Sequence, residues 1–329
     1  MLMGLMERTG KPAAHRIGGV LAALLLLARP GPARAADTLK LAIGQVGLWD
    51  SEVVEMGRRT GIFERHGIDP QPFYTQGGGE TQQAVISGSA DIGVSVGTLG
   101  VIGAFAKGAP IRIIGGEATG AAEYWFVPAD SPVKKAEDIT PGMTFAYSTA
   151  GSGTQIEALR FAQAHDIHPR MVATGSVPST FTQVMSHQVD VGFSTPPVGL
   201  REQAEGTIRI IALANDLPSV REQTVRVIIA NARDLDRRRD TYARFMQGYR
   251  ETIDWMYSDP AALDMYAAIT KVPVAVARDL RDRFYPKAML QTGEVSGLDS
   301  IMRDAVEFKY ARDVLTKEQV STLLQIPRD

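Results

Sequence analysis

The chain of 329 residues contains no cysteine. This absence excludes disulfides, cysteine-ligated zinc, iron–sulfur clusters and thiol nucleophiles. It also excludes a membrane anchor attached through a lipidated cysteine. A chain of this length buries about three quarters of the surface that its unfolded state exposes, so we expect the fold to need no such cross-link.

A surplus of positive charge and a long apolar run are also missing. The chain has 35 Lys and Arg against 37 Asp and Glu, and beyond residue 35 the balance is 30 against 36. Nucleic-acid affinity rests mainly on the neutralisation of phosphates, so this sign disfavours nucleic acid as a partner. No stretch beyond residue 35 approaches the roughly 18 apolar residues that indicate a spanning helix, so we expect no membrane insertion after export.

The first 35 residues have the layout of an export signal. Basic residues precede an apolar run over Ile17–Ala28, and Ala33-Arg34-Ala35 follows as an A-x-A cleavage site. The run is shorter than the roughly 20 residues that a transmembrane helix needs. We therefore predict a signal peptide at 1–35, cleavage near Ala35/Ala36, and a periplasmic protein.

Short apolar runs alternate with amphipathic stretches between residues 39 and 230, which indicates βαβ units and a mostly parallel sheet. A break at 118–123, after which the alternation restarts, indicates a second lobe. The expected strands are 39–44, 69–75, 91–95, 111–115, 124–127, 144–148, 172–174, 191–194, 208–212 and 225–230, with helices at 51–60, 80–87, 99–107, 154–165 and 180–186.

Beyond residue 231 the pattern is helical only. Tyr242, Phe245 and Tyr249, for example, recur at helical spacing. A helical segment this long must pack on other parts of the chain, and the first lobe is the expected surface. The predicted division is a signal peptide at 1–35, lobe I at 36–121 and 231–329, and lobe II at 122–230.

Small and hydroxyl-bearing residues follow six of the expected strands. In α/β sheets, ligands bind beyond the carboxyl ends of the strands, where helix N-termini offer free N–H groups. Each single turn is better explained by ordinary helix capping, but all six fall on the same predicted edge. The turns are 44–47, 76–79, 95–98, 148–154, 175–176 and 194–196.

Several segments resemble one branch of the periplasmic solute-binding proteins, the branch that serves nitrate, sulfonate, taurine and pyrimidine-precursor importers. The resemblance extends from about residue 39 to 231 and is weaker over the helical tail. It is carried by Met56–Ile68 (MGRRTGIFERHGI), Gly77–Gly79, Ile86–Gly93 (ISGSADIG), Lys107–Ile111 (KGAPI), Lys134–Phe145 (KKAEDITPGMTF) and Gly151–Thr154 (GSGT).

This resemblance implies a type II periplasmic binding protein fold, an α/β fold of two lobes that close on a ligand. Each lobe would be a mostly parallel sheet flanked by helices, with the helical tail packed on lobe I. It also implies delivery to an ABC permease and its ATPase. By position, the implied ligand-binding residues are Gln45, Trp49, Gly78, Gly79, Ser95, Gly97, Thr98, Tyr124, Ser148, Ser152, Gly153, Thr154, Ser176 and Thr195.

Two features of this set stay open at the level of sequence. Trp49 and Tyr124 are either rings that stack on a ligand or core aromatics. No arginine lies within the six turns, and Arg201, the nearest, is expected on a solvated face. A doubly charged ligand is therefore less supported than a singly charged or amphiphilic one.

An enzyme on the same scaffold is the main alternative. The enzymes that resemble this chain and share the scaffold depend on cysteine, which this chain lacks. The His165-x-x-His168 pair has no third metal ligand, and no hydrolase, zincin or phosphate-loop motif occurs. Glu80 and Glu117 are lone carboxylates, better suited to cap a helix or pair with a ligand amine than to act as a base. We expect no catalysis, cofactor or metal.

The sequence leaves the ligand open between two classes. We expect a small organic anion, a sulfonate or carboxylate with or without an aromatic ring. The alternative is a neutral heterocycle such as a pyrimidine, a thiamine precursor or a flavin. We expect no sensory role, because such a role would need an output domain and the sequence shows no sign of one. The expected oligomeric state is a monomer.

Overall fold

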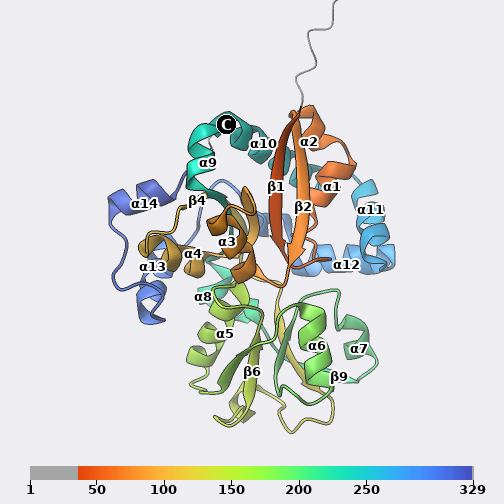
Figure 1. Ribbon diagram of the computed structural model, residues 1–329. Coiled ribbons are helices and arrows are strands. Elements are labelled where there is room, and N and C mark those ends of the chain that lie inside the picture. The colour runs from red at the N-terminus through yellow and green to blue at the C-terminus, as the bar shows by residue number, and fades with distance from the viewer. Residues whose placement is uncertain (1–35, 328–329) are drawn as a thin grey trace, which may run out of the picture. The chain divides into compact units, whose positions relative to one another are not determined.

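The computed structural model describes residues 36–327 (Figure 1). The predicted signal peptide at 1–35 lies outside these residues. Over the described part of the chain, every helix is either too short or too polar to cross a membrane.

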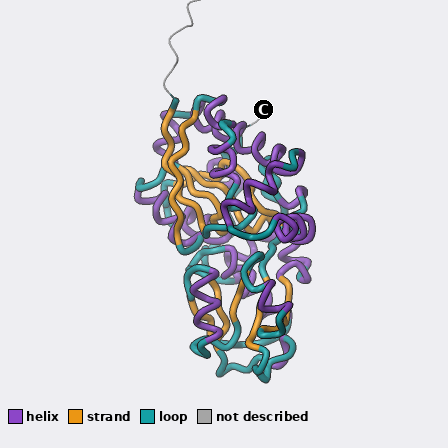
Figure 2. Tube along the Cα trace, turned by 90° about the vertical axis from the view of Figure 1, so that its right-hand side faces the viewer, coloured by secondary structure: helices purple, strands orange, loops and turns teal. Residues whose placement is uncertain are grey.

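A five-stranded sheet forms the centre of lobe I. Its strands are β1 (Asp37–Gly44), β2 (Ile68–Thr75), β3 (Ile92–Gly97), β4 (Ile111–Thr119) and β10 (Thr224–Asn231). The strand order is β2-β1-β3-β10-β4. The first three strands are parallel, whereas β10 is antiparallel to both of its neighbours. Every residue of β3 is buried, as expected for a strand whose sheet carries helices on both faces (Figure 2).

The helices between these strands are α1 (Val53–Arg59), α2 (Ile62–Arg65), α3 (Gly78–Ser87) and α4 (Thr98–Ala106). Helix α3 ends at Gly88, whose φ of 79° lies in the left-handed region where glycine carries no Cβ penalty. Helices α3 and α4 begin where β2 and β3 end, so their N-termini lie at the edge of the sheet that the sequence singled out.

The C-terminal tail packs on lobe I, which confirms the prediction. The stacked rings of Phe63 on α2 and Phe245 on α10 are 5.3 Å apart between centroids, and α10 and α11 lie beside α1 (Figure 1). The tail consists of α9 (Ala232–Arg237), α10 (Arg239–Ser258), α11 (Ala261–Thr270), α12 (Val274–Phe284), η3 (Lys287–Met289), α13 (Leu298–Glu307) and α14 (Lys317–Leu323).

Lobe II repeats the strand arrangement of lobe I. Strand β5 pairs antiparallel with β8 and β9, and β6 pairs parallel with β7. A bridge between Phe145 and Val191 joins the two parts, which gives the order β7-β6-β8-β5-β9. The strands are β5 (Tyr124–Pro128), β6 (Thr144–Tyr147), β7 (Arg170–Ala173), β8 (Gly192–Ser194) and β9 (Ile208–Leu213).

Aromatic stacking fills the core of lobe II. The Trp125 ring lies 5.4 Å from Phe145 and 5.0 Å from Phe161 between centroids. Such pairs stabilise by about 0.5–1.5 kcal/mol each beyond the area they bury. The helices around this core are η1 (Ala136–Asp138), α5 (Gly153–Ala164), α6 (Val177–Met185), α7 (Leu200–Ala204), η2 (Ala214–Asp216) and α8 (Pro218–Arg221).

Strand β10 corrects one prediction. We expected residues 224–230 in lobe II, but β10 pairs with β3 and β4 in the sheet of lobe I. The chain therefore returns to lobe I before residue 224. In each lobe the antiparallel strand, β5 or β10, is the one by which the chain enters from the other lobe, and this explains why the sheets are less parallel than expected.

The two lobes touch at several points. Arg160 on α5 donates from Nε to Asp304 Oδ2 on α13 at 3.1 Å. On another side, the Gly79 amide of α3 donates to Thr149 Oγ1 at 3.0 Å. These contacts join the two lobes directly.

Candidate ligand-binding site

A small pocket with a cavity volume of about 20 Å³ lies where the lobes meet. Both lobes contribute its walls, from the ends of strands β1, β3, β6 and β8 and from the first turns of α3 and α5. This is the position at which α/β sheets bind ligands. The lining residues are Gly44, Gln45, Leu48, Asp50, Ser51, Gly78, Ser95, Glu123, Ser148, Ser152, Gly153, Thr154, Phe193, Thr195 and Arg226.

The structure brings eight of the fourteen predicted residues to this pocket and leaves six away from its lining. Whether the eight contact a ligand stays a prediction. The eight are Gln45, Gly78, Ser95, Ser148, Ser152, Gly153, Thr154 and Thr195; the six are Trp49, Gly79, Gly97, Thr98, Tyr124 and Ser176.

The two candidate stacking rings are part of the protein core. Trp49 is fully buried, with its ring edge-on to Tyr266 at a centroid distance of 4.9 Å, and its indole N–H donates to Tyr257 Oη at 3.1 Å. Tyr124 donates its hydroxyl to the carbonyl of Val198. Of the two interpretations open at the level of sequence, the structure supports core packing.

The remaining four have structural roles beside the pocket. Thr98 donates from Oγ1 to the carbonyl of Thr224 at 2.5 Å, and Ser176 caps α6 by accepting from the Ser179 amide. Gly79 and Gly97 lie against the backbone of the other lobe. Their lack of a side chain permits this close approach.

A cluster of hydroxyl groups forms the lobe II wall. Thr154 Oγ1 accepts from the Ser148 amide at 2.8 Å and lies within 2.9 Å of the Ser148 and Ser152 hydroxyls. Ser152 Oγ also caps α5 by accepting from the Gln155 amide at 3.2 Å. The helix begins here because serine satisfies a free amide at its N-terminus, and the same residue faces the pocket.

The lobe I wall contains two residues with unusual backbone conformations. Gln45 and Ser95 have φ values of 71° and 61°, in the left-handed region that non-glycine residues rarely adopt. Such conformations concentrate at functional sites, where the surrounding structure enforces them. The Gln45 side chain also connects the lobes, because its Oε1 accepts from the Val177 amide at 3.0 Å.

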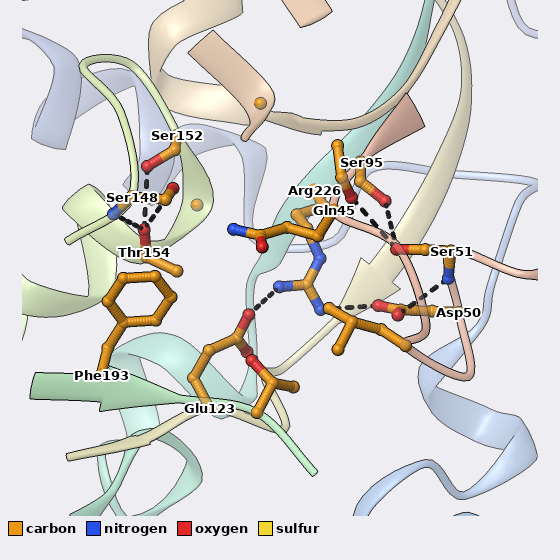
Figure 3. A pocket seen from close by; sticks show the side chains of 15 residues that line it. Gln45, Asp50, Ser51, Ser95, Glu123, Ser148, Ser152, Thr154, Phe193 and Arg226 are labelled. Carbon is orange, nitrogen blue, oxygen red and sulfur yellow. Dashed lines mark hydrogen bonds and ion pairs between the residues drawn. The ribbon is translucent and has the colours of Figure 1, made fainter. Parts of the chain in front are cut away.

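An ion-pair network spans the pocket. Arg226 on β10 donates from Nη2 to Asp50 Oδ2 at 2.9 Å and from Nη1 to Glu123 Oε1 at 2.5 Å. Figure 3 shows the Arg226 guanidinium between these two carboxylates. Ser148, Ser152 and Thr154 lie on the side of the guanidinium away from Asp50. All three charged residues are buried. This network places an arginine at the pocket, although none lies within the six turns.

Arg201, the arginine nearest in sequence, is on the surface as expected, with its side chain 81% exposed. Arg226 is not among the predicted residues because those were taken mainly from the turns, whereas Arg226 lies inside a strand. A single charge in the apolar run TVRVIIAN was the available signal. The other lining residues outside the predicted fourteen are Gly44, Leu48, Asp50, Ser51, Glu123 and Phe193.

Two further acids are buried beside this network. Glu117 Oε1 accepts from the Ser95 hydroxyl at 2.6 Å, and Glu157 Oε1 is 3.9 Å from Arg226 Nη1. Burial raises the pKa of Glu117 to about 8, and the Asp50 charge adds to this. Burial likewise raises the pKa of Glu157 well above its ordinary value. Burial also raises the pKa of Glu123, against the attraction of Arg226.

The raised pKa of Glu117 predicts a stability that falls with pH. The unfolded chain releases this proton near the ordinary value of 4.5, whereas the folded protein keeps it up to about 8. Between these values the folded state binds more protons, so the free energy of unfolding declines by up to about 1.4 kcal/mol per pH unit for this one group. Burial and the charges of Asp50 and Glu123 cause the shift, while Arg226 and the Ser95 hydroxyl oppose it.

We therefore expect the Glu117→Gln variant to lose less stability than the parent between about pH 5 and 8. Urea unfolding at several pH values measures this, with the exposed Glu205→Gln as the control. Equal slopes for E117Q and the parent would show that Glu117 titrates normally.

Within residues 36–327, no three His, Asp or Glu side chains are arranged to hold a metal ion. His165 pairs with Glu137 at 3.3 Å, and the side chain of His168 is 78% exposed.

Solved structures of two sulfonate-binding proteins and a nitrate-binding protein are similar to this one. The alkanesulfonate-binding protein SsuA from Xanthomonas axonopodis pv. citri, bound to MOPS, is 18% identical with a TM-score of 0.71, over 88% of this chain and 98% of that chain. The periplasmic aliphatic sulphonate binding protein SsuA from Escherichia coli is 17% identical with a TM-score of 0.65, over 89% and 93%. The periplasmic nitrate-binding protein NrtA from Synechocystis PCC 6803 is 13% identical with a TM-score of 0.66, over 88% and 86%.

No curated protein sequence matches the chain. The sequence model of the family described as NMT1/THI5 like matches residues 54–263, which is more than half of the chain. Together with the two-lobed structure, this match shows that the protein belongs to the NMT1/THI5-like family and has the type II fold of periplasmic binding proteins.

Proposed function

We propose that this protein is the periplasmic solute-binding component of an ABC importer. It captures a small polar molecule between its lobes and delivers it to a membrane permease that an ATPase drives. The pocket between the lobes carries this proposal, because its walls come from both lobes and its residues lie at the carboxyl ends of both sheets. A ligand there would favour the closed arrangement of the lobes by contacting both.

Three observations support a periplasmic protein that binds its ligand and does not catalyse a reaction. The similar structures are of sulfonate-binding and nitrate-binding proteins. The hydroxyls of Ser148, Ser152 and Thr154 are linked by hydrogen bonds, and that of Ser152 caps α5, which suits polar recognition more than nucleophilic attack. Residues 1–35 have the layout of a signal peptide.

The charges of the pocket narrow the ligand class. The sequence led us to expect an organic anion, and the N-terminus of α5 would favour one. However, Asp50 and Glu123 line the pocket, and both are already paired with Arg226. An anion would have to approach these carboxylates in a buried site, at a high electrostatic cost. We therefore favour a ligand without negative charge over the expected sulfonate or carboxylate.

A thermal-shift screen of the exported protein tests the proposed function. The library contains amines, heterocycles, carboxylates, sulfonates and nitrate, and a ligand at about 100 times its dissociation constant adds roughly 2.7 kcal/mol of stability. We expect a compound that stabilises the protein and is recovered chemically unchanged. A compound that is consumed would instead indicate an enzyme.

The pocket itself is tested with a Gly153→Val variant. A Cβ at this position lies 3.2 Å from Arg226 Cγ and 3.5 Å from Glu157 Oε1, so the larger valine side chain would intrude on the pocket wall. We expect binding to be lost while cooperative unfolding remains. Gly142→Ala is the control, because nothing lies within 4 Å of its Cβ position. Unchanged affinity in G153V would place the ligand elsewhere.

A further inference from the structure

Carboxylates outnumber cations around the pocket. Asp50, Glu117, Glu123 and Glu157 all act on Arg226, and all five side chains are buried. If every acid were ionised, the group would carry three uncompensated negative charges. Burial of unpaired charge is costly, so such a group is neutralised by protonation or by a bound counter-charge.

The guanidinium of Arg226 does not satisfy these acids. Its Nη1 and Nη2 are engaged by Glu123 Oε1 and Asp50 Oδ2. Glu123 Oε2, both carboxylate oxygens of Glu157 and Glu117 Oε2 are buried and have no hydrogen-bond partner. Buried carboxylate oxygens are normally hydrogen-bonded. These atoms therefore leave acceptor capacity that the described protein does not use.

Two of the unpartnered groups border the pocket. Glu123 and Thr195 both line it, and both are at least nine-tenths buried. Thr195 Oγ1, like Glu123 Oε2, has no hydrogen-bond partner. Glu123 also lines a second depression of about 460 Å³, which includes Ile210, Leu213 and Phe284. One carboxylate is thus common to the pocket and to this wider space between the lobes.

We infer that the pocket binds an organic cation, a small molecule whose protonated nitrogen donates to Glu123 Oε2 and to the Thr195 hydroxyl. This inference rests on the solute-binding function proposed above and specifies its ligand class. The nitrogen supplies the donors that these oxygens lack, and its charge offsets part of the carboxylate surplus. Glu157 and Glu117 contribute through their charge, and the Ser148, Ser152 and Thr154 hydroxyls face the rest of the molecule.

The raised pKa values of Glu117, Glu123 and Glu157 are consistent with this picture. In the ligand-free protein the surplus is relieved by holding protons. When a cation binds, a carboxyl group can release its proton, because the positive charge of the ligand then stabilises the carboxylate.

Matched compounds that differ only in charge test the inference. One series is benzylamine, benzyl alcohol, benzoate and benzenesulfonate; a second is propylamine, propanol, propionate and propanesulfonate; a third is aminomethylpyridine, pyridylmethanol, nicotinate and pyridinesulfonate. Calorimetry with the exported protein at low salt gives the affinities. In at least one series we expect the ammonium compound to bind at least tenfold more tightly than its neutral and anionic counterparts.

Variants assign this preference to named side chains. Glu123→Gln removes the charge and keeps the shape, and we expect it to reduce the ratio of amine to alcohol affinity at least tenfold. Thr195→Val leaves the charges in place and should weaken the amine several-fold. A merely structural role for Glu123 would weaken all compounds alike and leave the ratio unchanged. Glu205→Gln, the same change on the surface of lobe II, is the control.

The outcomes separate this inference from the function on which it rests. If the alcohols, carboxylates or sulfonates bind more tightly than the amines, the inferred cationic ligand is wrong, but the proposed solute-binding function still holds. An amine preference that persists in E123Q would also overturn the assigned contact. If no compound of any charge binds in these series or in the wider screen, both the inference and the proposed function fail.

Discussion

The Arg226→Met variant is expected to lose about 3–5 kcal/mol of its free energy of unfolding, because removal of one partner leaves buried charges uncompensated. The guanidinium pairs with Asp50 at 2.9 Å and with Glu123 at 2.5 Å. Methionine has a similar volume but no charge. Urea unfolding of the chain without residues 1–35 at neutral pH measures the loss.

The pH dependence of this loss identifies its electrostatic origin. Arg226 lowers the pKa values of Glu117, Glu123 and Glu157, which burial raises. Without Arg226 these acids would hold protons to still higher pH. The penalty should therefore be small near pH 5 and should grow toward pH 8, because the unfolded chain has released these protons there whereas the folded variant still binds them.

Arg226→Lys is the matched control, because it keeps the charge but cannot reach both carboxylates with a planar group of donors. We expect an intermediate loss of stability. A Met variant as stable as the parent, or one destabilised equally at pH 5 and pH 8, would mean that the network contributes nothing specific.

The Gly97→Ala variant is expected to bind its ligand roughly a hundredfold more weakly or worse, because the closed arrangement becomes hard to populate. A Cβ at residue 97 would lie 2.4 Å from the Gly151 carbonyl oxygen, 2.5 Å from the Ser152 carbonyl carbon and 2.7 Å from the Gly153 amide nitrogen. All three atoms belong to the backbone of the opposite lobe. They cannot rotate away as a flexible side chain could, so the lobes must separate.

Stability should respond far less than affinity in G97A. Opening the lobes relieves the clash without creating a cavity in either core, so the free energy of unfolding should stay close to that of the parent. Calorimetry with the ligand from the screen gives the affinity, and small-angle scattering with that ligand reports whether the lobes close. Gly142→Ala is the control, since its Cβ position is open. Full affinity and full compaction in G97A would show that closure does not require this contact.

Much of the local structure could be predicted from the sequence, because the spacing of apolar residues and the residue types in turns are local properties. The expected strand at 39–44 is observed at 37–44, and the expected helix at 154–165 is observed at 153–164. Hydroxyl residues such as Ser152 do follow the strands, and eight of the fourteen predicted residues line one pocket.

The sequence by itself therefore determined the order of the elements and the edge of the sheets at which the pocket lies. It also indicated the family, whose model matches residues 54–263.

Only the tertiary structure decided the chemistry of that pocket. Arg226 is separated from Asp50 by 176 residues and from Glu123 by 103, and no local pattern relates positions so far apart. Their meeting depends on β10 crossing into the sheet of lobe I, which the periodicity of the chain does not reveal. The burial of Trp49 likewise depends on Tyr257 and Tyr266, which lie on helices of the tail. The spacing of apolar residues determines which face of a helix or strand is buried. The charge of a site depends instead on which elements, distant in sequence, the fold packs together.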